Sequence, residues 1–198
     1  MSPSRSKYFN HLMETASQDE LRAIQNERLR EICHYVYQNN DAYKRLFDEK
    51  GVGPQDIRSV DDIVHLPMLC KEDLRTHYPL GLCCIARRQL REMHMSSGST
   101  GSPVVMPYTE SDLEQWAECM ARCLVMSGLR PGDTIQITPS FGLFNGGFGF
   151  YHGARKAGMF VIPTGAGNTP RQIQLIKDFG VRGLMGVVSY GLRIIEEL

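Results

Sequence analysis

The sequence predicts an α/β protein. A helical N-terminal region, residues 1–82, precedes a layered domain, residues 83–198, with a largely parallel β-sheet flanked by helices. Apolar residues in the first eighty positions recur at helical spacing. Beyond residue 128, short apolar runs alternate with helical segments, and glycine, asparagine and proline separate them. Such alternation favours right-handed crossovers and parallel strand pairing.

Start and stop signals define the helices of the N-terminal region. Ser17 and Glu20 fit a capping box ahead of a long run of helical periodicity. A second helix is expected at 41–50, because Gly51 can end it in a left-handed conformation. A short helix should begin at Lys71.

The pattern changes near residue 90. Residues 91–95 alternate like a strand and 104–106 resume as one, which predicts a hairpin-like pair with a long connecting loop. Thr109 with Asp112 should cap a helix that ends at Gly128.

The remaining chain alternates between the two element types. We expect strands at 134–138, 159–162 and 183–188, and helices at 147–157 and 170–179. Thr169 before Pro170 at the first helical position is a strong start signal. Ser189 should cap a last amphipathic helix that no glycine or proline closes, so we expect the natural protein to continue.

Charge and cysteine content exclude several classes of protein. The chain has 22 basic and 22 acidic residues and no charged block, which argues against nucleic acid and membrane surfaces as partners. The polar N-terminus does not resemble a signal peptide. Six cysteines without a C-x-x-C pair indicate reduced thiols and a cytoplasmic location. A homodimer is left open.

The segment Ser96-Ser97-Gly98-Ser99-Thr100-Gly101-Ser102 is the most specific feature of the chain. Its glycines allow positive φ and close approach of a ligand to the backbone. Successive N–H groups in such turns can form an anion-binding nest, to which the hydroxyls add further donors. The segment lacks the lysine and glycine spacing of a Walker A loop. It predicts a polyphosphate cradle, and the alternative is a flexible hairpin tip.

This loop resembles the S-S-G-T-T-G-K-P loop of adenylate-forming ligases. Ser99 replaces a threonine and keeps the hydroxyl, whereas Ser102 replaces a lysine and removes a cation. The wider chain is similar to the N-terminal part of phenylacetate–coenzyme A ligases. The similar segments, in order, are 27–30, 43–47, 66–67, 71–75, 78–82, 108–109, 130–133, 142–147 and 167–173.

The resemblance implies that the chain is part of the large domain of an enzyme that uses ATP, Mg²⁺ and coenzyme A. An aryl carboxylic acid similar to phenylacetate would become an acyl-adenylate and then a thioester. The loop would hold the ATP phosphates, and Phe141, Phe144, Gly146 and Gly147 would form part of the acyl pocket. The alternative for these four residues is that the aromatic rings belong to the core and the glycines allow helix–sheet packing. For His152, a packed or capping role on its helix is favoured over a place beside the acyl site.

The family's later motifs have no counterpart in the 198 residues. They supply the Mg²⁺ ligand, the ribose-binding aspartate and the catalytic lysine, so no catalytic residue is assigned and the chain alone is expected to lack ligase turnover. Two other hypotheses about function stay open. One is an adenylating enzyme for another acid or acceptor, and the other is a non-catalytic nucleotide-binding or structural remnant.

Overall fold

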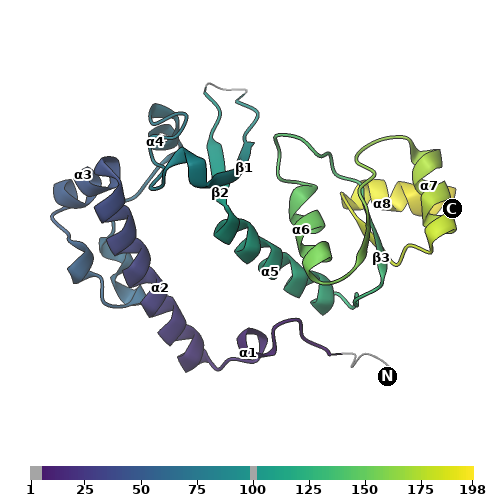
Figure 1. Ribbon diagram of the computed structural model, residues 1–198, viewed down its shortest axis with the longest axis horizontal. Helices are drawn as coiled ribbons and strands as arrows, with labels where there is room; N and C mark the ends of the chain where they lie inside the picture. The colour runs from purple at the N-terminus through teal and green to yellow at the C-terminus, as the bar shows by residue number, and fades with distance from the viewer. Residues whose placement is uncertain (1–5, 99–101) are drawn as a thin grey trace. The chain divides into compact units, whose positions relative to one another are not determined.

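The computed structural model describes residues 6–98 and 102–198, which form two compact units (Figure 1). One unit is Thr15–Pro107, and the other combines the described part of Met1–Glu14 with Tyr108–Leu198. Each unit is described by itself. The functional division expected at residues 82 and 83 stays a prediction.

The unit Thr15–Pro107 is mainly helical. Its elements are α2 (Gln18–Asn39), α3 (Asp41–Lys50), η1 (Pro54–Asp56), η2 (Val60–His65), α4 (Lys71–Thr76), η3 (Arg87–Gln89), β1 (Leu90–Met95) and β2 (Val105–Thr109), of which β2 runs into the second unit. The predicted capping box is present, since Ser17 Oγ accepts from Glu20 N–H and the Glu20 carboxylate accepts from Ser17 N–H. Gly51 ends α3 with φ 69°. Cys33, Phe47 and Ile57 form the small core.

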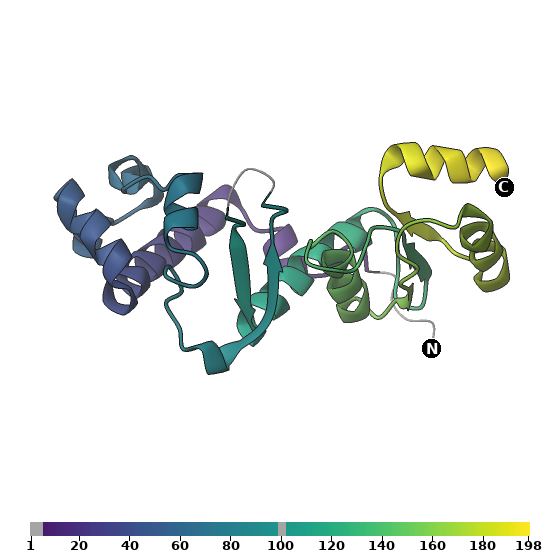
Figure 2. The ribbon, with the colours of Figure 1, turned by 90° about the horizontal axis from the view of Figure 1, so that it is seen from above.

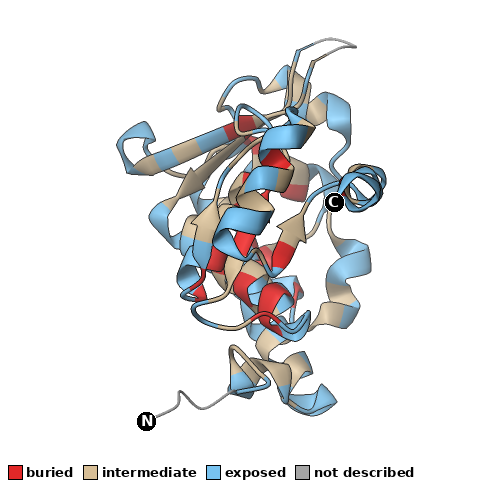
Figure 3. Ribbon diagram, turned by 90° about the vertical axis from the view of Figure 1, so that its right-hand side faces the viewer, coloured by how far each residue is buried: buried red, intermediate tan, exposed pale blue. Residues whose placement is uncertain are grey.

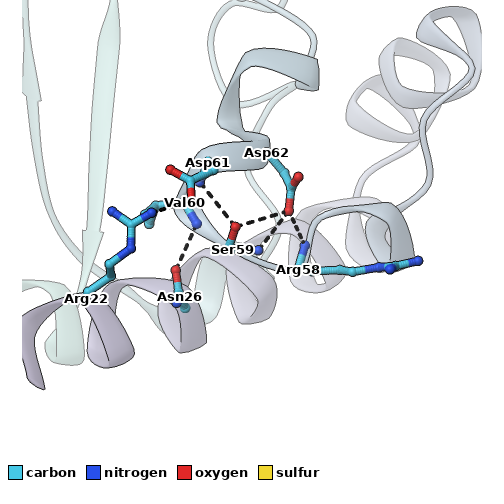
Figure 4. A network of polar contacts seen from close by, with 7 residues as sticks. All are labelled: Arg22, Asn26, Arg58, Ser59, Val60, Asp61 and Asp62. Carbon is cyan, nitrogen blue, oxygen red and sulfur yellow. Dashed lines mark hydrogen bonds and ion pairs between the residues drawn. The ribbon is translucent and has the colours of Figure 1, made fainter. Parts of the chain in front are cut away.

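Polar contacts hold η2 against the first turns of α2 (Figure 4). Asn26 Oδ1 accepts from Val60 N–H at 2.8 Å, and Arg22 pairs with Asp61. Asp62 accepts from the N–H groups of Arg58 and Ser59, both at 2.9 Å. The N-terminal helices are therefore joined by specific bonds as well as by their core.

The predicted hairpin is confirmed, because β1 and β2 pair in a two-stranded sheet. The pair is seen from above in Figure 2. The loop expected to bind phosphate connects these two strands.

The second unit contains the parallel sheet. Its elements are α1 (His11–Glu14), α5 (Glu110–Met126), β3 (Thr134–Ile137), α6 (Phe148–Lys156), β4 (Phe160–Ile162), α7 (Thr169–Phe179), β5 (Gly183–Met185) and α8 (Val188–Glu197). The strand order is β4-β3-β5, and β3 is parallel to both neighbours. Ile135 pairs with Val161 of β4 and with Gly183 of β5. The α/β prediction is confirmed.

The two faces of β3 contact different helices. Ile135 and Ile137 are fully buried in a core with side chains of α5 and α6. Figure 3 colours the ribbon by burial, with the buried residues in red. A Cβ at Gly153 of α6 would lie 2.4 Å from Met120 Cβ of α5, so these helices pack with their backbones close together. Gln136, between the two isoleucines, points to the opposite face and bonds to Gln172 of α7. The sheet thus lies between α5–α6 and α7.

The starts of the last two helices differ from the sequence prediction. Asn168, not Thr169, is the N-cap of α7, with φ 53° and its side chain accepting from Arg171 N–H. β5 ends at Met185, so Val188 lies in α8 instead of the strand. Val187 precedes α8 without a side-chain cap, and Ser189 is already inside the helix. No helix in the two described ranges is long and apolar enough to cross a membrane.

Candidate functional site

The carboxyl ends of β3 and β5 form a topological switch point. The chain leaves β3 toward α6, on one face of the sheet, and leaves β5 toward α8, which contacts α7 on the other face. Two neighbouring parallel strands whose connections diverge in this way leave a crevice between their ends. Ligands of open α/β sheets bind in such crevices.

A cavity of about 390 Å³ lies at this point. Three loops, one after each strand of the sheet, and the first turn of α8 supply its lining. The lining residues are Thr138, Pro139, Ser140, Ala166, Gly167, Val187 and Tyr190. The lining contains small and apolar groups, three hydroxyls and no charged side chain. Such a lining suits an uncharged, flat group, because a buried carboxylate would need a cation or several donors close by.

Two threonine hydroxyls join the ends of the strands beside the cavity. Thr138 Oγ1 and Thr138 N–H both donate to Met185 O at 2.9 Å, which joins the ends of β3 and β5. Thr164 Oγ1 donates to Ile137 O at 2.9 Å and joins the ends of β4 and β3. A Cβ at Gly186 would lie 2.2 Å from Thr138 Oγ1. A side chain at residue 186 would therefore displace this hydroxyl.

Tyr190 of α8 completes one side of the cavity. Its hydroxyl lies 3.3 Å from Thr169 Oγ1 and 3.5 Å from Gly167 O, so it contacts the loop that follows β4. None of the seven lining residues was among the predicted site residues. They are far apart in the sequence, so no single motif marks them. Glycine, threonine and proline after an apolar run do indicate a strand end.

The predicted acyl segment lies next to the cavity but does not line it. Phe141 packs against the rings of Phe148 and Tyr151 of α6, with centroids 5.3 and 6.2 Å apart. A Cβ at Gly147 would lie 3.0 Å from the Phe141 ring. Phe144 is 55% exposed. A Cβ at Gly146 would lie 3.6 Å from Pro139, which is a lining residue. Contact of these four residues with an acid stays a prediction.

His152 is packed among aromatic side chains. Its ring lies 5.7 Å from Trp116, 6.1 Å from Phe148 and 5.8 Å from Tyr151, measured between centroids. Trp116 in turn stacks on Tyr108 at 5.4 Å. His152 is half-buried, and this arrangement agrees with the packed histidine that the sequence favours.

Only part of the expected phosphate loop lies in the described residues. Ser99, Thr100 and Gly101 lie outside them. Ser96 forms the base of the loop, since its N–H donates to Val104 O and its Oγ accepts from Val104 N–H, both at 2.9 Å. The Ser96 N–H is thus bonded to the protein, and of the Ser96 donors only the hydroxyl can still donate a hydrogen bond to a phosphate. Gly98 has φ 65°, the left-handed conformation that favours glycine.

The outer residues of the loop are accessible. Ser97 and Ser102 are exposed to solvent and Gly98 is half-buried. Within residues 6–98 and 102–198, no three His, Cys, Asp or Glu side chains are grouped so that they could hold a metal ion. The binding of ATP phosphates by residues 96–102 stays a prediction.

Solved structures with a similar fold are coenzyme A ligases. A 2-hydroxyisobutyryl-CoA ligase in complex with 2-HIB-AMP and CoA, in the thioesterification state, aligns with 99% of this chain and 43% of its own. The TM-score is 0.90 and the identity 27%. An open conformation of that ligase, also with 2-HIB-AMP and CoA, aligns with a TM-score of 0.89 over 99% of this chain and 47% of its own. The chain thus has the fold of part of an adenylate-forming coenzyme A ligase.

Curated relatives agree more specifically. The phenylacetate-coenzyme A ligase of Aromatoleum evansii is 44% identical over 186 residues, which are 94% of this chain and 42% of that protein. Those of Thermus thermophilus and Escherichia coli are both 42% identical, over 93% and 94% of this chain. No family model matches the chain. The predicted resemblance is confirmed: the chain is a homologue of phenylacetate-coenzyme A ligases and spans less than half of their length.

Proposed function

We propose that the chain is the acid- and phosphate-binding part of an AMP-forming acid–coenzyme A ligase whose substrate is an aryl acid similar to phenylacetate. The observation that carries the proposal is the uncharged cavity at the switch point, in a chain 40–44% identical to phenylacetate-coenzyme A ligases. Its volume of about 390 Å³ accommodates a phenyl ring.

The lining supports one orientation of the acid. With no charged side chain in the cavity, the ring enters and the carboxylate stays at the mouth. The carboxylate oxygen then attacks the α-phosphorus of ATP, the bond to the bridging oxygen breaks, and pyrophosphate leaves. In the second step the coenzyme A sulfur attacks the acyl carbon, the thiol proton goes to solvent or a base, and AMP leaves.

In the same proposal, the loop Ser96–Ser102 binds the phosphates of ATP. The hydroxyls of Ser96, Ser97 and Ser102 and the N–H groups beyond Ser96 would bind the β- and γ-phosphates, which stabilises charge as pyrophosphate departs. Mg²⁺ would balance phosphate charge, and its protein ligands are expected outside this chain. No step is assigned to a residue that holds it.

Filling the cavity with a larger side chain tests whether it binds the acid. Val187 lines the cavity and is 69% exposed, whereas the next residue, Val188, is 78% exposed and is not a lining residue. Calorimetry and ligand-observed NMR should detect phenylacetate binding to the chain. Val187→Trp should weaken it at least about tenfold, and Val188→Trp should leave it unchanged. Equal effects of the two variants would contradict the assignment of the cavity.

The class of function is tested with nucleotides. ATP should bind the chain, and an acid panel of phenylacetate, benzoate, indole acetate and a fatty acid should identify the preferred acid. A chain that binds neither ATP, AMP nor any acid would be a structural remnant. Coenzyme A- and phenylacetate-dependent AMP release by these 198 residues would contradict the expectation that they lack turnover alone.

We also propose a cytoplasmic location. The six cysteines are free thiols, and ATP and coenzyme A are intracellular reactants.

A further inference from the structure

We propose that Gln172 is a positioning residue of the acid pocket: its buried amide holds the loop after β4, residues 163–168, in the shape that forms one wall of the cavity, and it thereby sets which acids fit. The inference about acids rests on the proposed function. The inference about the loop rests on geometry alone.

One side-chain amide bonds to two carbonyls of this loop. Gln172 Nε2 donates to Gly165 O at 2.8 Å and to Gly167 O at 3.1 Å. An amide nitrogen has two hydrogens, so both donors are used. Ala166, the residue between these carbonyls, and Gly167 itself line the cavity. Gln172 of α7 therefore bonds to both carbonyls that flank Ala166 in this wall.

The partner of Gln172 is in the central strand. Gln136 Nε2 donates to Gln172 Oε1 and also to Gln172 O, the latter at 3.2 Å. Gln136 is 0% exposed and Gln172 is 2% exposed. A reversed Gln172 amide would place its oxygen against two carbonyl oxygens and its NH₂ against another NH₂. Only one orientation is compatible with these contacts, so the sheet determines how the amide faces the loop.

The loop has a backbone shape that local sequence alone does not hold. Gly165, Gly167 and Asn168 have φ of 71°, 88° and 53°, all in the left-handed region. Three such residues among four allow many other shapes, because glycine is conformationally permissive. The two bonds from Gln172 select one of them. Without the amide, Gly165 O and Gly167 O would lose their bonds to Gln172, Gly167 O would keep only the 3.5 Å contact with the Tyr190 hydroxyl, and Ala166 would be less restrained.

On the side that faces the cavity, the loop contacts Tyr190. Tyr190 lines the cavity, and its hydroxyl also contacts Gly167 O. Gln172 thus acts from behind the wall and touches no ligand in the proposed pose. A change at this position should alter the shape of the pocket without removing a group that binds the acid.

The experiment compares Gln172→Glu and Gln172→Met with Gln174→Glu. Gln174 lies on the same helix and is exposed, which makes the same change a matched control. Amide hydrogen exchange should become at least about tenfold faster in residues 163–168 of both Gln172 variants, since two hydrogen bonds are lost. Exchange in β3 and α5 should stay near wild type. The methionine variant covers the case in which a buried carboxylate prevents folding.

Selectivity is the readout that a purely structural role would not change. Binding is measured with phenylacetate and with the bulkier 1-naphthylacetate. We expect the ratio of their dissociation constants to move toward one, at least about fivefold, in the Gln172 variants, while ATP affinity and the Gln174→Glu protein stay unchanged. Proportional loss of both acids, or unchanged exchange in the loop, would overturn the proposal. If the wild-type chain binds neither acid, the proposed function fails and so does the selectivity part, and loop exchange alone then decides whether Gln172 positions the wall.

Discussion

The hairpin loop and the sheet-edge cavity represent two ways of building a candidate ligand site. The loop of residues 96–102 is one continuous segment, whose expected binding groups are backbone N–H and short hydroxyls. The cavity takes its lining from residues 138–140, from residues 166–167, and from Val187 and Tyr190, which meet only because three parallel strands end at the same edge. The loop has a recognisable sequence, whereas the cavity has a recognisable position in the fold.

This difference determines how each region responds to substitution. Ligand groups on a backbone tolerate side-chain changes, so the loop should be altered mainly by charge and by loss of glycine. The cavity depends on the exact fit of small residues between strand ends, where an added methyl group displaces a neighbour. Three predictions follow this contrast, from the largest expected effect to the smallest.

Gly186→Ala should have the largest effect of the three, and this effect should be confined to the cavity. The new Cβ would lie 2.2 Å from Thr138 Oγ1, whose bond to Met185 O joins β3 and β5. Overpacking of this kind costs about 1–3 kcal/mol, measured as the free energy of urea unfolding, and phenylacetate binding should weaken. Gly191→Ala is the control, because nothing lies within 4 Å of its added Cβ and α8 should gain about 0.5–1 kcal/mol. Equal stability of the two variants would show that residue 186 is not tightly packed against Thr138.

Ser102→Lys should have an intermediate effect, confined to the loop. It restores the lysine of the related ligases at an exposed position, where a single added charge near phosphate is worth up to about 1 kcal/mol. ATP should bind roughly threefold more tightly at low salt, and the gain should shrink as ionic strength rises. Ser189→Lys, exposed on α8, should leave ATP affinity unchanged. Weaker ATP binding by Ser102→Lys would argue that the loop does not face phosphate.

At low pH, the two units should differ slightly in how much stability they lose. In the unit Thr15–Pro107, backbone N–H bonds lower the pKa of three carboxyls: Ser17 N–H acts on Glu20, Arg58 N–H on Asp62 and Cys70 N–H on Asp73. In the other unit, the hydrogen bond from Lys156 lowers the pKa of Glu114. A lowered pKa gives stability that is present above the ordinary values of 3.8 for Asp and 4.5 for Glu, and that is lost as pH falls through the folded-state value.

The helical unit should therefore lose more protection than the sheet unit as the pH falls below the ordinary carboxyl pKa values. Glu20 and Glu114 are exposed and Asp62 and Asp73 are half-buried at the surface, so solvent screening keeps the difference small. Hydrogen exchange at a series of pH values, corrected for intrinsic rates, measures it. Substituting Asp62 and Asp73 by Asn should reduce the difference, and greater acid loss in the sheet unit would contradict the assignment.

Local sequence was sufficient where structure depends on neighbours in the chain. The capping residues Ser17 and Thr109, the αL glycine Gly51 and the alternation of strands and helices all agree with prediction. Helix starts were misplaced at residues 168 and 188. There Asn168 adopts a left-handed conformation, and α8 begins without a side-chain cap, so no polar signal marks its start.

Site residues were predicted only when they formed a motif. The segment 141–147 was selected for its aromatic rings and glycines, yet the Phe141 ring packs on α6 and the cavity is lined by the residues just before it, Thr138 to Ser140. Gln136 and Gln172 are two ordinary polar residues, 36 positions apart. Nothing local distinguishes them from exposed glutamines such as Gln174.

By itself, the sequence determined the class of fold, the hairpin loop and the relationship to phenylacetate-coenzyme A ligases, because periodicity, capping and motifs are properties of contiguous residues. Only the tertiary structure decided which strand ends meet, which small residues line the cavity and which glutamine faces the loop after β4. The physical reason is that these contacts depend on the order and direction of strands in the sheet, which bring distant residues within hydrogen-bonding distance.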